Sequence, residues 1–179
     1  MKHGMFLICL VVSCCASAQP LMTRNGYIGF FSKTPFENIK AENNQVNAVM
    51  DLAKQSLAFA VLVKGFLFEK ALMQEHFNEN YIESDKYPKA TFSGTYAGAV
   101  DVTKPGTYPV IVKGQLSLHG VTRAIEVPAA LQVQQGTLNG KAAFALKPQD
   151  FNIKIPSLVR EKIAKQISVS VNVDFHLSN

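Results

Sequence analysis

The chain has 179 residues, and its 18 Lys and Arg outnumber its 13 Asp and Glu to give a formal net charge of +5. The basic residues are scattered, and their densest cluster is only Arg160, Lys162 and Lys165. Nucleic-acid binding needs a stripe of basic charge with aromatic residues between, so we expect no nucleic-acid partner. The mild surplus favours solubility and leaves open a weak contact with anionic membrane surfaces.

Residues 1–18 have the pattern of a secretory signal peptide. Lys2 precedes an apolar run over residues 5–12, and Ala16-Ser17-Ala18 follows with the small residues that a signal peptidase requires. The run is too short for a membrane-spanning helix, which needs about 20 apolar residues. We therefore expect residues 1–18 to be removed and residues 19–179 to form an exported domain, periplasmic or secreted.

A lipoprotein alternative stays open at Cys14. Residues 11–14 resemble a lipoprotein box, in which Cys14 would carry the lipid and begin the mature chain. We favour cleavage before Gln19, because small residues occupy both required positions there. All 3 cysteines precede Gln19, so this cleavage leaves a thiol-free mature chain of about 160 residues. It excludes disulfides and thiolate chemistry and fits one domain.

Alternation of apolar and polar residues predicts strands along most of the mature chain. The clearest case runs from Ile167 to Leu177, where apolar and polar residues alternate without a break. Short glycine-containing turns join the middle segments and indicate an antiparallel meander. The predicted strands cover residues 27–32, 46–51, 56–64, 90–100, 108–118, 125–133, 138–146 and 167–177.

Two stretches break the alternation. Residues 69–81 place apolar residues at the spacing of an amphipathic helix, and residues 157–165 predict a shorter helical piece after Pro156. About eight strands with one main helix predict an all-β, eight-stranded antiparallel barrel with more than about 45% of its residues in strands. A barrel of this size either fills its interior with side chains or holds one ligand there.

Three blocks of sequence carry a family resemblance. The first is Leu-Met-Gln-Glu-His-Phe at 72–77, followed by Lys-Tyr-Pro at 86–88 and Ala-Thr-Phe at 90–92. The second is Gly-Gln-Leu-Ser-Leu-His-Gly-Val-Thr-Arg at 114–123, and the third is Asp-Phe-Asn-Ile at 150–153. In this order the blocks resemble the helix, hairpin and C-terminal loop motifs of the YceI-like family.

The resemblance extends roughly from residue 26 to the end and implies a lipocalin-like barrel that binds polyisoprenoid chains inside. The partner it implies is an apolar lipid such as a polyisoprenoid. The chain departs from the family in its N-terminal strands, which show Phe30-Phe31-Ser32 and residues 59–61 in place of the usual histidine signature. Asn152 also stands where glycine is usual. These departures leave the identity of the lipid open.

The histidines do not form an evident metal or catalytic site. Metal binding needs three or more converging ligands, and the nearest candidate set is Glu75, His76 and Glu79. The two glutamates share a helix face, whereas His76 points about 100° away. We therefore expect no metal and no cofactor, with a structural role for His76 at the barrel mouth. His119 and His176 are expected to be solvated.

Catalytic motifs are also missing from the sequence. It contains no G-x-S-x-G elbow, no serine–histidine–acid order and no glycine-rich phosphate loop. Paired carboxylates such as Glu79 and Glu83 indicate a solvated helix face. We therefore expect a protein that is not an enzyme.

The inward-facing apolar residues are the candidate binding site. The helix over 72–77 is expected to line or close one end of the barrel. The alternative is a filled core, which would make the chain a structural or interaction module of the cell envelope; the oligomeric state stays open in both cases. The expected ligand-binding residues are Phe59, Val61, Leu72, Phe77, Leu116, Leu118, Phe144, Val171 and Phe175.

Overall fold

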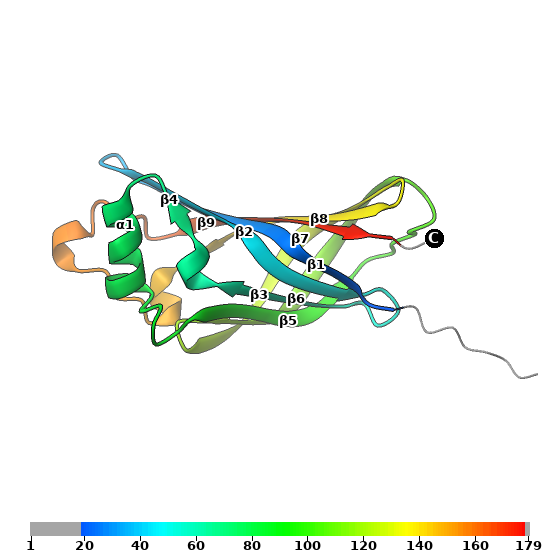
Figure 1. The fold of residues 1–179 in the computed structure, drawn as a ribbon, viewed down its shortest axis with the longest axis horizontal. Helices are drawn as coiled ribbons and strands as arrows, with labels where there is room; N and C mark the ends of the chain where they lie inside the picture. The colour runs from blue at the N-terminus through cyan, green and yellow to red at the C-terminus, as the bar shows by residue number, and fades with distance from the viewer. Residues whose placement is uncertain (1–18, 178–179) are drawn as a thin grey trace, which may run out of the picture.

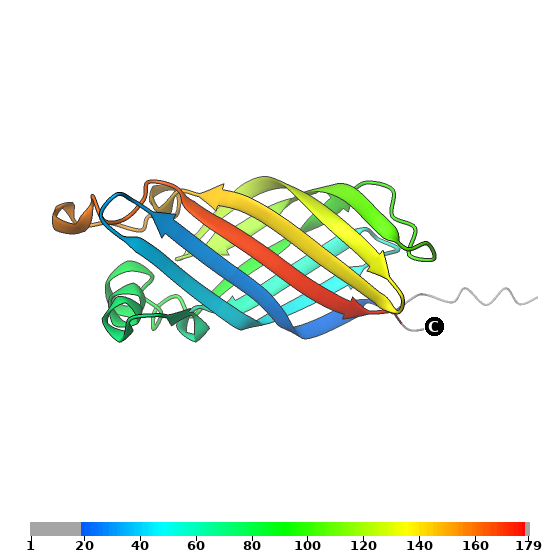
Figure 2. The ribbon, with the colours of Figure 1, turned by 90° about the horizontal axis from the view of Figure 1, so that it is seen from above.

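The computed structural model describes residues 19–177, so the signal peptide expected at 1–18 lies outside the described part. Long antiparallel strands wrap into a barrel with a helix at one end (Figure 1), and Figure 2 shows them inclined to its long axis. The strands are β1 (Leu21–Lys33), β2 (Asn38–Asp51), β3 (Ser56–Leu62), β4 (Leu67–Phe68), β5 (Lys89–Ala97), β6 (Gly106–Leu118), β7 (Val121–Gln134), β8 (Thr137–Leu146) and β9 (Ile167–His176).

Strand pairing confirms the eight-stranded antiparallel barrel. The order around the sheet is β1-β9-β8-β7-β6-β5-β3-β2, and the pairing of β2 with β1 closes the circle. The two-residue strand β4 is a ninth strand that pairs only with β2. Strands account for more than half of the described residues, in agreement with the alternation of the sequence.

The last strand shows why the alternation builds a barrel. In β9, Val169, Val173 and Phe175 are buried, while Ser170 and Asp174 between them are exposed. Successive side chains of a strand point to opposite faces of the sheet. When eight such strands close on themselves, the apolar face of each becomes the interior, as the sequence predicted.

A pair of glycines lets β5 and β6 approach closely. Gly94 lies opposite Gly114, and a Cβ at Gly94 would stand 2.2 Å from the carbonyl oxygen of Lys113 and 2.7 Å from the Cα of Gly114. No side chain fits in that space. Glycines inside strands are typical of places where a strand bends or where backbones come close together in a barrel.

The edge of β2 changes partner along its length. β3 pairs with residues 47–51 of β2, whereas β4 pairs with Ala41 and Glu42 nearer the helix end. Between them the buried Asn43 donates from Nδ2 to the Leu62 carbonyl (3.1 Å) and accepts from the Gln45 N–H (2.8 Å). Its amide therefore satisfies backbone groups where β3 ends, two residues before the predicted end at residue 64.

The main helix lies across one end of the barrel. It consists of α1 (Ala71–His76) and one π-helical turn, η2 (Phe77–Tyr81), which confirms the helix predicted over 69–81 with a start two residues later. The second helical piece, predicted over 157–165, is reduced to a 3₁₀ turn, η4 (Ser157–Val159). Leu158 in η4 is 93% exposed and no residue of η4 is fully buried, so little apolar burial is available to stabilise a longer helix.

The opposite end of the barrel is filled with large side chains. Phe175 and Leu138 face each other across β9 and β8, and both are completely buried. They belong to one packed cluster of buried residues, which also contains Ala48, Met50, Leu57, Tyr96, Val110, Leu131, Val133 and Val173. The barrel is therefore a tube that is packed at one end.

Asn152 stands where the third family motif usually has glycine, and its backbone conformation shows why the chain tolerates the change. It ends the 3₁₀ turn η3 (Pro148–Phe151) with φ +56° and ψ +21°, in the left-handed region. Glycine adopts this conformation freely, and asparagine is the side chain that tolerates it best.

We expect Asn152→Gly to fold with unchanged or slightly higher stability, because glycine removes the Cβ clash. Asn152→Val should lower the free energy of unfolding by about 1–2 kcal/mol, since a β-branched residue is strained in this region. Urea unfolding of the two variants measures the difference. Equal stability of the valine variant and the parent protein would contradict this account.

Candidate ligand-binding cavity

A cavity of about 530 Å³ lies at the helix end of the barrel. Its walls come from barrel strands and from the segments that cross the mouth, namely α1, η2 and the connection between β8 and β9. Its lining is overwhelmingly apolar. The lining side chains include Ile28, Phe30, Val61, Val63, Phe66, Phe68, Leu72, Met73, Phe77, Ile82, Leu116, Leu118, Phe144, Leu146, Phe151, Ile153, Ile155, Ile163, Ile167 and Val169.

A second cavity of about 130 Å³ lies deeper in the barrel. It shares Ile28, Val61, Ala90, Leu116 and Phe144 with the first cavity, and its floor is formed by residues of the packed cluster. The two cavities therefore follow one another along the barrel. Strands of 13 or 14 residues at about 3.3 Å per residue and a tilt of about 40° span roughly 35 Å along the axis. The packed cluster takes up part of this length, and the two cavities occupy the part toward the helix end.

Four phenylalanines cover the first cavity on its helix side. Phe30 of β1, Phe66, Phe68 of β4 and Phe77 of η2 pack together with ring centroids 5.1–6.0 Å apart. Tilted and edge-to-face rings at these distances attract one another beyond the area that they bury. This aromatic cluster attaches the helical segment to the barrel wall, and all of its members line the cavity.

Ser32 holds the other covering segment. The connection between β8 and β9 runs back over the mouth, and the Ala164 N–H donates to the buried Oγ of Ser32 (2.9 Å). At its other end, Nε of Arg123 donates to the Asp150 carbonyl (3.0 Å). Two hydrogen bonds therefore fix this segment to β1 and β7.

The expectation that His119 is solvated was wrong. The residue is only 8% exposed, and its ring lies 4.6 Å from the ring of Tyr87. Nδ1 is 2.9 Å from the Phe151 carbonyl oxygen and Nε2 is 2.8 Å from Oε2 of Glu83. The β6–β7 turn that carries His119 is thus covered by two distant loops, which the local turn sequence does not reveal.

The hydrogen bonds of His119 position part of the cavity wall. A carbonyl oxygen only accepts, so Nδ1 carries a proton and donates to Phe151. Phe151 is buried and lines the first cavity, and its peptide is held by this bond. By contrast, His176 is exposed on β9 as expected, and His76 lies exposed on α1 at the rim of the first cavity.

The charged residues at the first cavity lie at its mouth, and among the described residues the exposed Lys141 of β8 borders the second cavity. Nζ of Lys70 lies 3.1 Å from Oε1 of Glu37, and both line the rim together with Lys147 and Lys162. Deeper inside, burial raises the pKa of the Tyr96 phenol, and the charge of Asp51 raises it further. Tyr96 therefore stays neutral beside the second cavity. Over residues 19–177 there is no group of three potential metal ligands and no helix able to cross a membrane.

The structure brings most of the expected binding residues to the cavities. Val61, Leu116 and Phe144 line both; Leu72, Phe77 and Leu118 line the first; Phe59 and Val171 line the second. Phe175 lines neither, because it lies in the packed cluster at the far end.

Sequence reasoning missed wall residues that lie outside the long strands. These are Phe66 and Phe68 around β4, and Phe151, Ile153 and Ile155 after η3. A signal existed for the second group, because the three residues alternate with polar ones as in a half-buried strand. No comparable pattern marks Phe66 and Phe68, whose burial depends on the contact with Phe30 and Phe77.

Comparison with known proteins agrees with this architecture. A family profile described as "YceI-like domain" matches residues 21–177. No curated protein sequence matches the chain.

Several solved structures share the fold. A polyisoprenoid binding domain from Saccharophagus degradans, described as implicated in plant cell wall breakdown, is 13% identical with a TM-score of 0.75, covering 89% of this chain and 98% of that one. BcnA of Burkholderia cenocepacia is 17% identical with a TM-score of 0.71, covering 83% and 95%. A Campylobacter jejuni YceI protein is 17% identical with a TM-score of 0.64, covering 80% and 87%. At these identities the likeness establishes the fold.

Removal of the His119 ring should destabilise the protein. In His119→Asn the residue still tolerates its left-handed φ of +51°, but the buried Phe151 carbonyl and Glu83 lose their partner. We expect a loss of about 2 kcal/mol in the free energy of unfolding. The matched variant His176→Asn, on the exposed face of β9, should change stability by less than about 0.5 kcal/mol. Similar effects of the two substitutions in thermal unfolding would contradict the assignment.

Proposed function

The chain belongs to the YceI-like domain family, and from this premise we propose that it is a binding protein that holds an elongated apolar lipid, isoprenoid-like, inside its barrel. The observation that carries the proposal is the pair of apolar cavities in line along the barrel, with a shared wall at Ile28, Val61, Ala90, Leu116 and Phe144. The polyisoprenoid binding of the Saccharophagus domain supports the choice of lipid.

Apolar burial supplies the binding energy in this proposal. Each buried CH₂ group contributes about 0.8 kcal/mol, so a five-carbon isoprene unit contributes about 3–4 kcal/mol before the cost of ordering the chain. Two or three units therefore suffice for stable binding without a charged partner deep inside. A narrow tube also selects a linear chain over a bulky ring system, because the second cavity is small.

Binding is favoured over catalysis by the lining of the cavities. A nucleophile or an acid–base pair has to lie within hydrogen-bond distance of the reacting atoms. The described charged groups at the first cavity lie at its rim, where Lys70 pairs with Glu37, and the one charged residue that borders the second cavity, Lys141, is exposed to solvent. The wall that would contact the lipid is formed mainly by aliphatic and aromatic side chains. Such side chains bind a lipid and exclude water, but the aliphatic and phenylalanine side chains transfer no proton.

Replacement of cavity residues by tryptophan separates a lipid carrier from a filled barrel. Leu118 and Phe144 both face the first cavity, so Leu118→Trp and Phe144→Trp should fill free space and fold with little change in melting temperature. The same variants should lose co-purifying lipid, which native mass spectrometry or organic extraction measures. If instead they lose about 1–3 kcal/mol of stability while bound lipid is unchanged or absent, the barrel is a filled module of the cell envelope.

Phe175→Trp is the matched control. Phe175 is completely buried in the packed cluster and lines neither cavity. The larger ring should overpack the cluster and lower stability by about 1–3 kcal/mol. Because the ring lies outside both cavities, lipid bound per folded molecule should stay at the level of the parent protein.

We also propose that the domain acts after export, in the periplasm or outside the cell. Residues 1–18 carry the signal-peptide pattern, with Ala16-Ser17-Ala18 before Gln19. The intact mass of the exported protein should correspond to a chain that begins at Gln19. A mass that begins at Cys14 with an attached diacylglycerol would assign the protein to the lipoproteins instead.

A further inference from the structure

Large apolar side chains are exposed on three separate segments around the mouth of the first cavity. Phe36 in the β1–β2 turn is 68% exposed, Leu72 on α1 is 61% exposed and Leu158 in η4 is 93% exposed. The three segments are distant in sequence but project from the same end of the barrel (Figures 1 and 2). A single exposed apolar residue is ordinary, whereas several around one cavity entrance indicate contact with an apolar phase.

The opposite end of the barrel is different. The exposed residues of its turns include the polar side chains of Lys54 and Gln55 between β2 and β3 and of Thr103 and Lys104 between β5 and β6, while Val102 is half-buried. Toward this end, Met22 near the start of β1 is 64% exposed, and Ile111 of β6, next to Val110 of the packed cluster, is 38% exposed. The apolar tips are therefore concentrated where the cavity opens.

Positive charge accompanies these tips. The connection between β8 and β9, residues 147–166, carries five basic side chains against Asp150 and Glu161. Among the described residues, none of the five has a carboxylate oxygen within 4.0 Å. The basic residues are Lys147, Lys154, Arg160, Lys162 and Lys165. A protruding leucine flanked by unpaired basic residues is the pattern of a segment that enters the interface of an anionic membrane.

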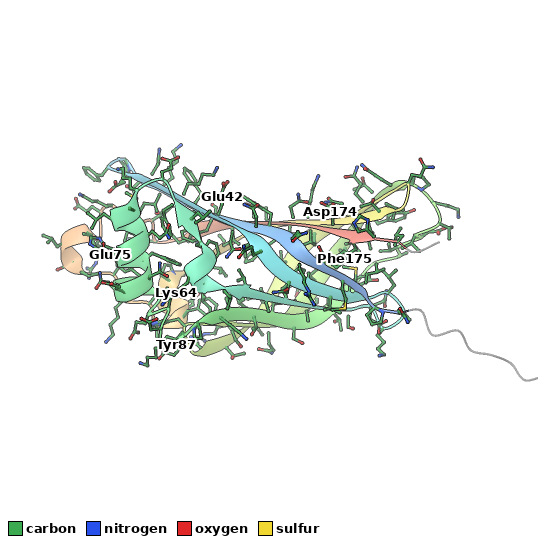
Figure 3. The ribbon with its side chains drawn as sticks, viewed as in Figure 1. Glu42, Lys64, Glu75, Tyr87, Asp174 and Phe175 are labelled. Atoms are coloured by element: carbon green, nitrogen blue, oxygen red, sulfur yellow. The ribbon has the colours of Figure 1, made fainter. Side chains whose placement is uncertain are left out.

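The helix contributes less to such a contact. α1 and η2 expose Glu75 and Glu79, and Figure 3 shows Glu75 at the helix end of the molecule. These carboxylates would be repelled by anionic headgroups. The β1–β2 turn, by contrast, follows the exposed Lys33 at the end of β1, three residues before Phe36, and the carboxylate of its Glu37 is paired with Lys70. The favourable surface therefore consists of the 147–166 connection and the β1–β2 turn, with Leu72 at the edge of the cavity.

We propose that this surface docks on a lipid bilayer that contains anionic headgroups, with Leu158 and Phe36 in the interface. This inference rests on the proposed function, because docking places the cavity mouth against the phase from which an insoluble lipid must come. Lys162, Val159 and Ile163 of the same connection line the first cavity. A lipid would thus pass between bilayer and barrel along an apolar path without crossing water.

Vesicle binding tests the docking surface directly. The exported protein is mixed with vesicles of phosphatidylcholine, with or without phosphatidylglycerol, and the bound fraction is measured by co-sedimentation. We expect binding to the anionic vesicles, weakened by high salt. Lys154→Gln combined with Arg160→Gln should weaken it about 30-fold, and Leu158→Ser about tenfold. None of these residues lines a cavity.

Matched variants at the opposite end are the controls. Met22 is as exposed as Phe36, and Lys54 and Lys104 lie in surface turns. Met22→Ser, and Lys54→Gln combined with Lys104→Gln, should leave vesicle binding unchanged. Equal losses in control and mouth variants would overturn the proposal, as would a wild-type protein that fails to bind anionic vesicles. Self-association that Leu158→Ser abolishes would assign the surface to a second copy and also overturn it.

Lipid content separates this inference from the proposed function. Native mass spectrometry of the same variants should detect bound lipid at the wild-type level, because the cavity walls are intact. Wild-type protein that carries lipid but ignores vesicles would refute docking and leave the binding function standing. Wild-type protein that binds vesicles through Leu158 but never carries lipid would refute the binding function and leave docking standing.

Discussion

The hydrogen-bonded pairing of β1 with β2 closes the sheet, and a closed sheet turns half of its side chains into an interior. The backbone edges of the barrel strands are then satisfied by neighbours, so the chain needs no disulfide to hold the tube together. Along β2 the pairing partner changes from β3 to β4 toward the helix end. There the amide of Asn43 replaces part of the ladder, and this irregular edge coincides with the cavity end.

What the tube contains depends on the size of the side chains at each level. At one end Phe175 and Leu138 are completely buried in the packed cluster and line neither cavity. Toward the middle, Ala90 and Val61 face the axis and two cavities open. Phe30 and Phe77 then cover the first cavity from the helix side. A tube that is packed at one end and covered at the other admits a ligand only past the covering segments.

These covering segments are held by few polar contacts, and each is made by residues far apart in sequence. His119 links Glu83 to the Phe151 peptide, and Ser32 binds the Ala164 N–H. Such contacts position a wall but are few beside the strand ladders, and the helical segment is held in addition by the aromatic cluster of Phe30, Phe66, Phe68 and Phe77. Leu72 and Leu158, two of the exposed apolar tips, belong to these covering segments, so in our proposal the ligand enters at the surface that contacts its source.

The sequence by itself determined which side chains face inward, because alternation along a strand is a local consequence of the pleat. It also located the helix over 69–81, but it overestimated the 157–165 helix, since a helix needs a buried face to be stable. Phe175 and Phe144 look equivalent in sequence, yet one is packed and the other lines a cavity. Likewise His119 is buried only because Glu83 and Phe151, 36 and 32 residues away, cover its turn. Only the tertiary structure decides whether an inward side chain is packed or lines a cavity, because its height along the barrel depends on the register between strands. It also decides whether a turn is buried, because the covering loops are distant in sequence.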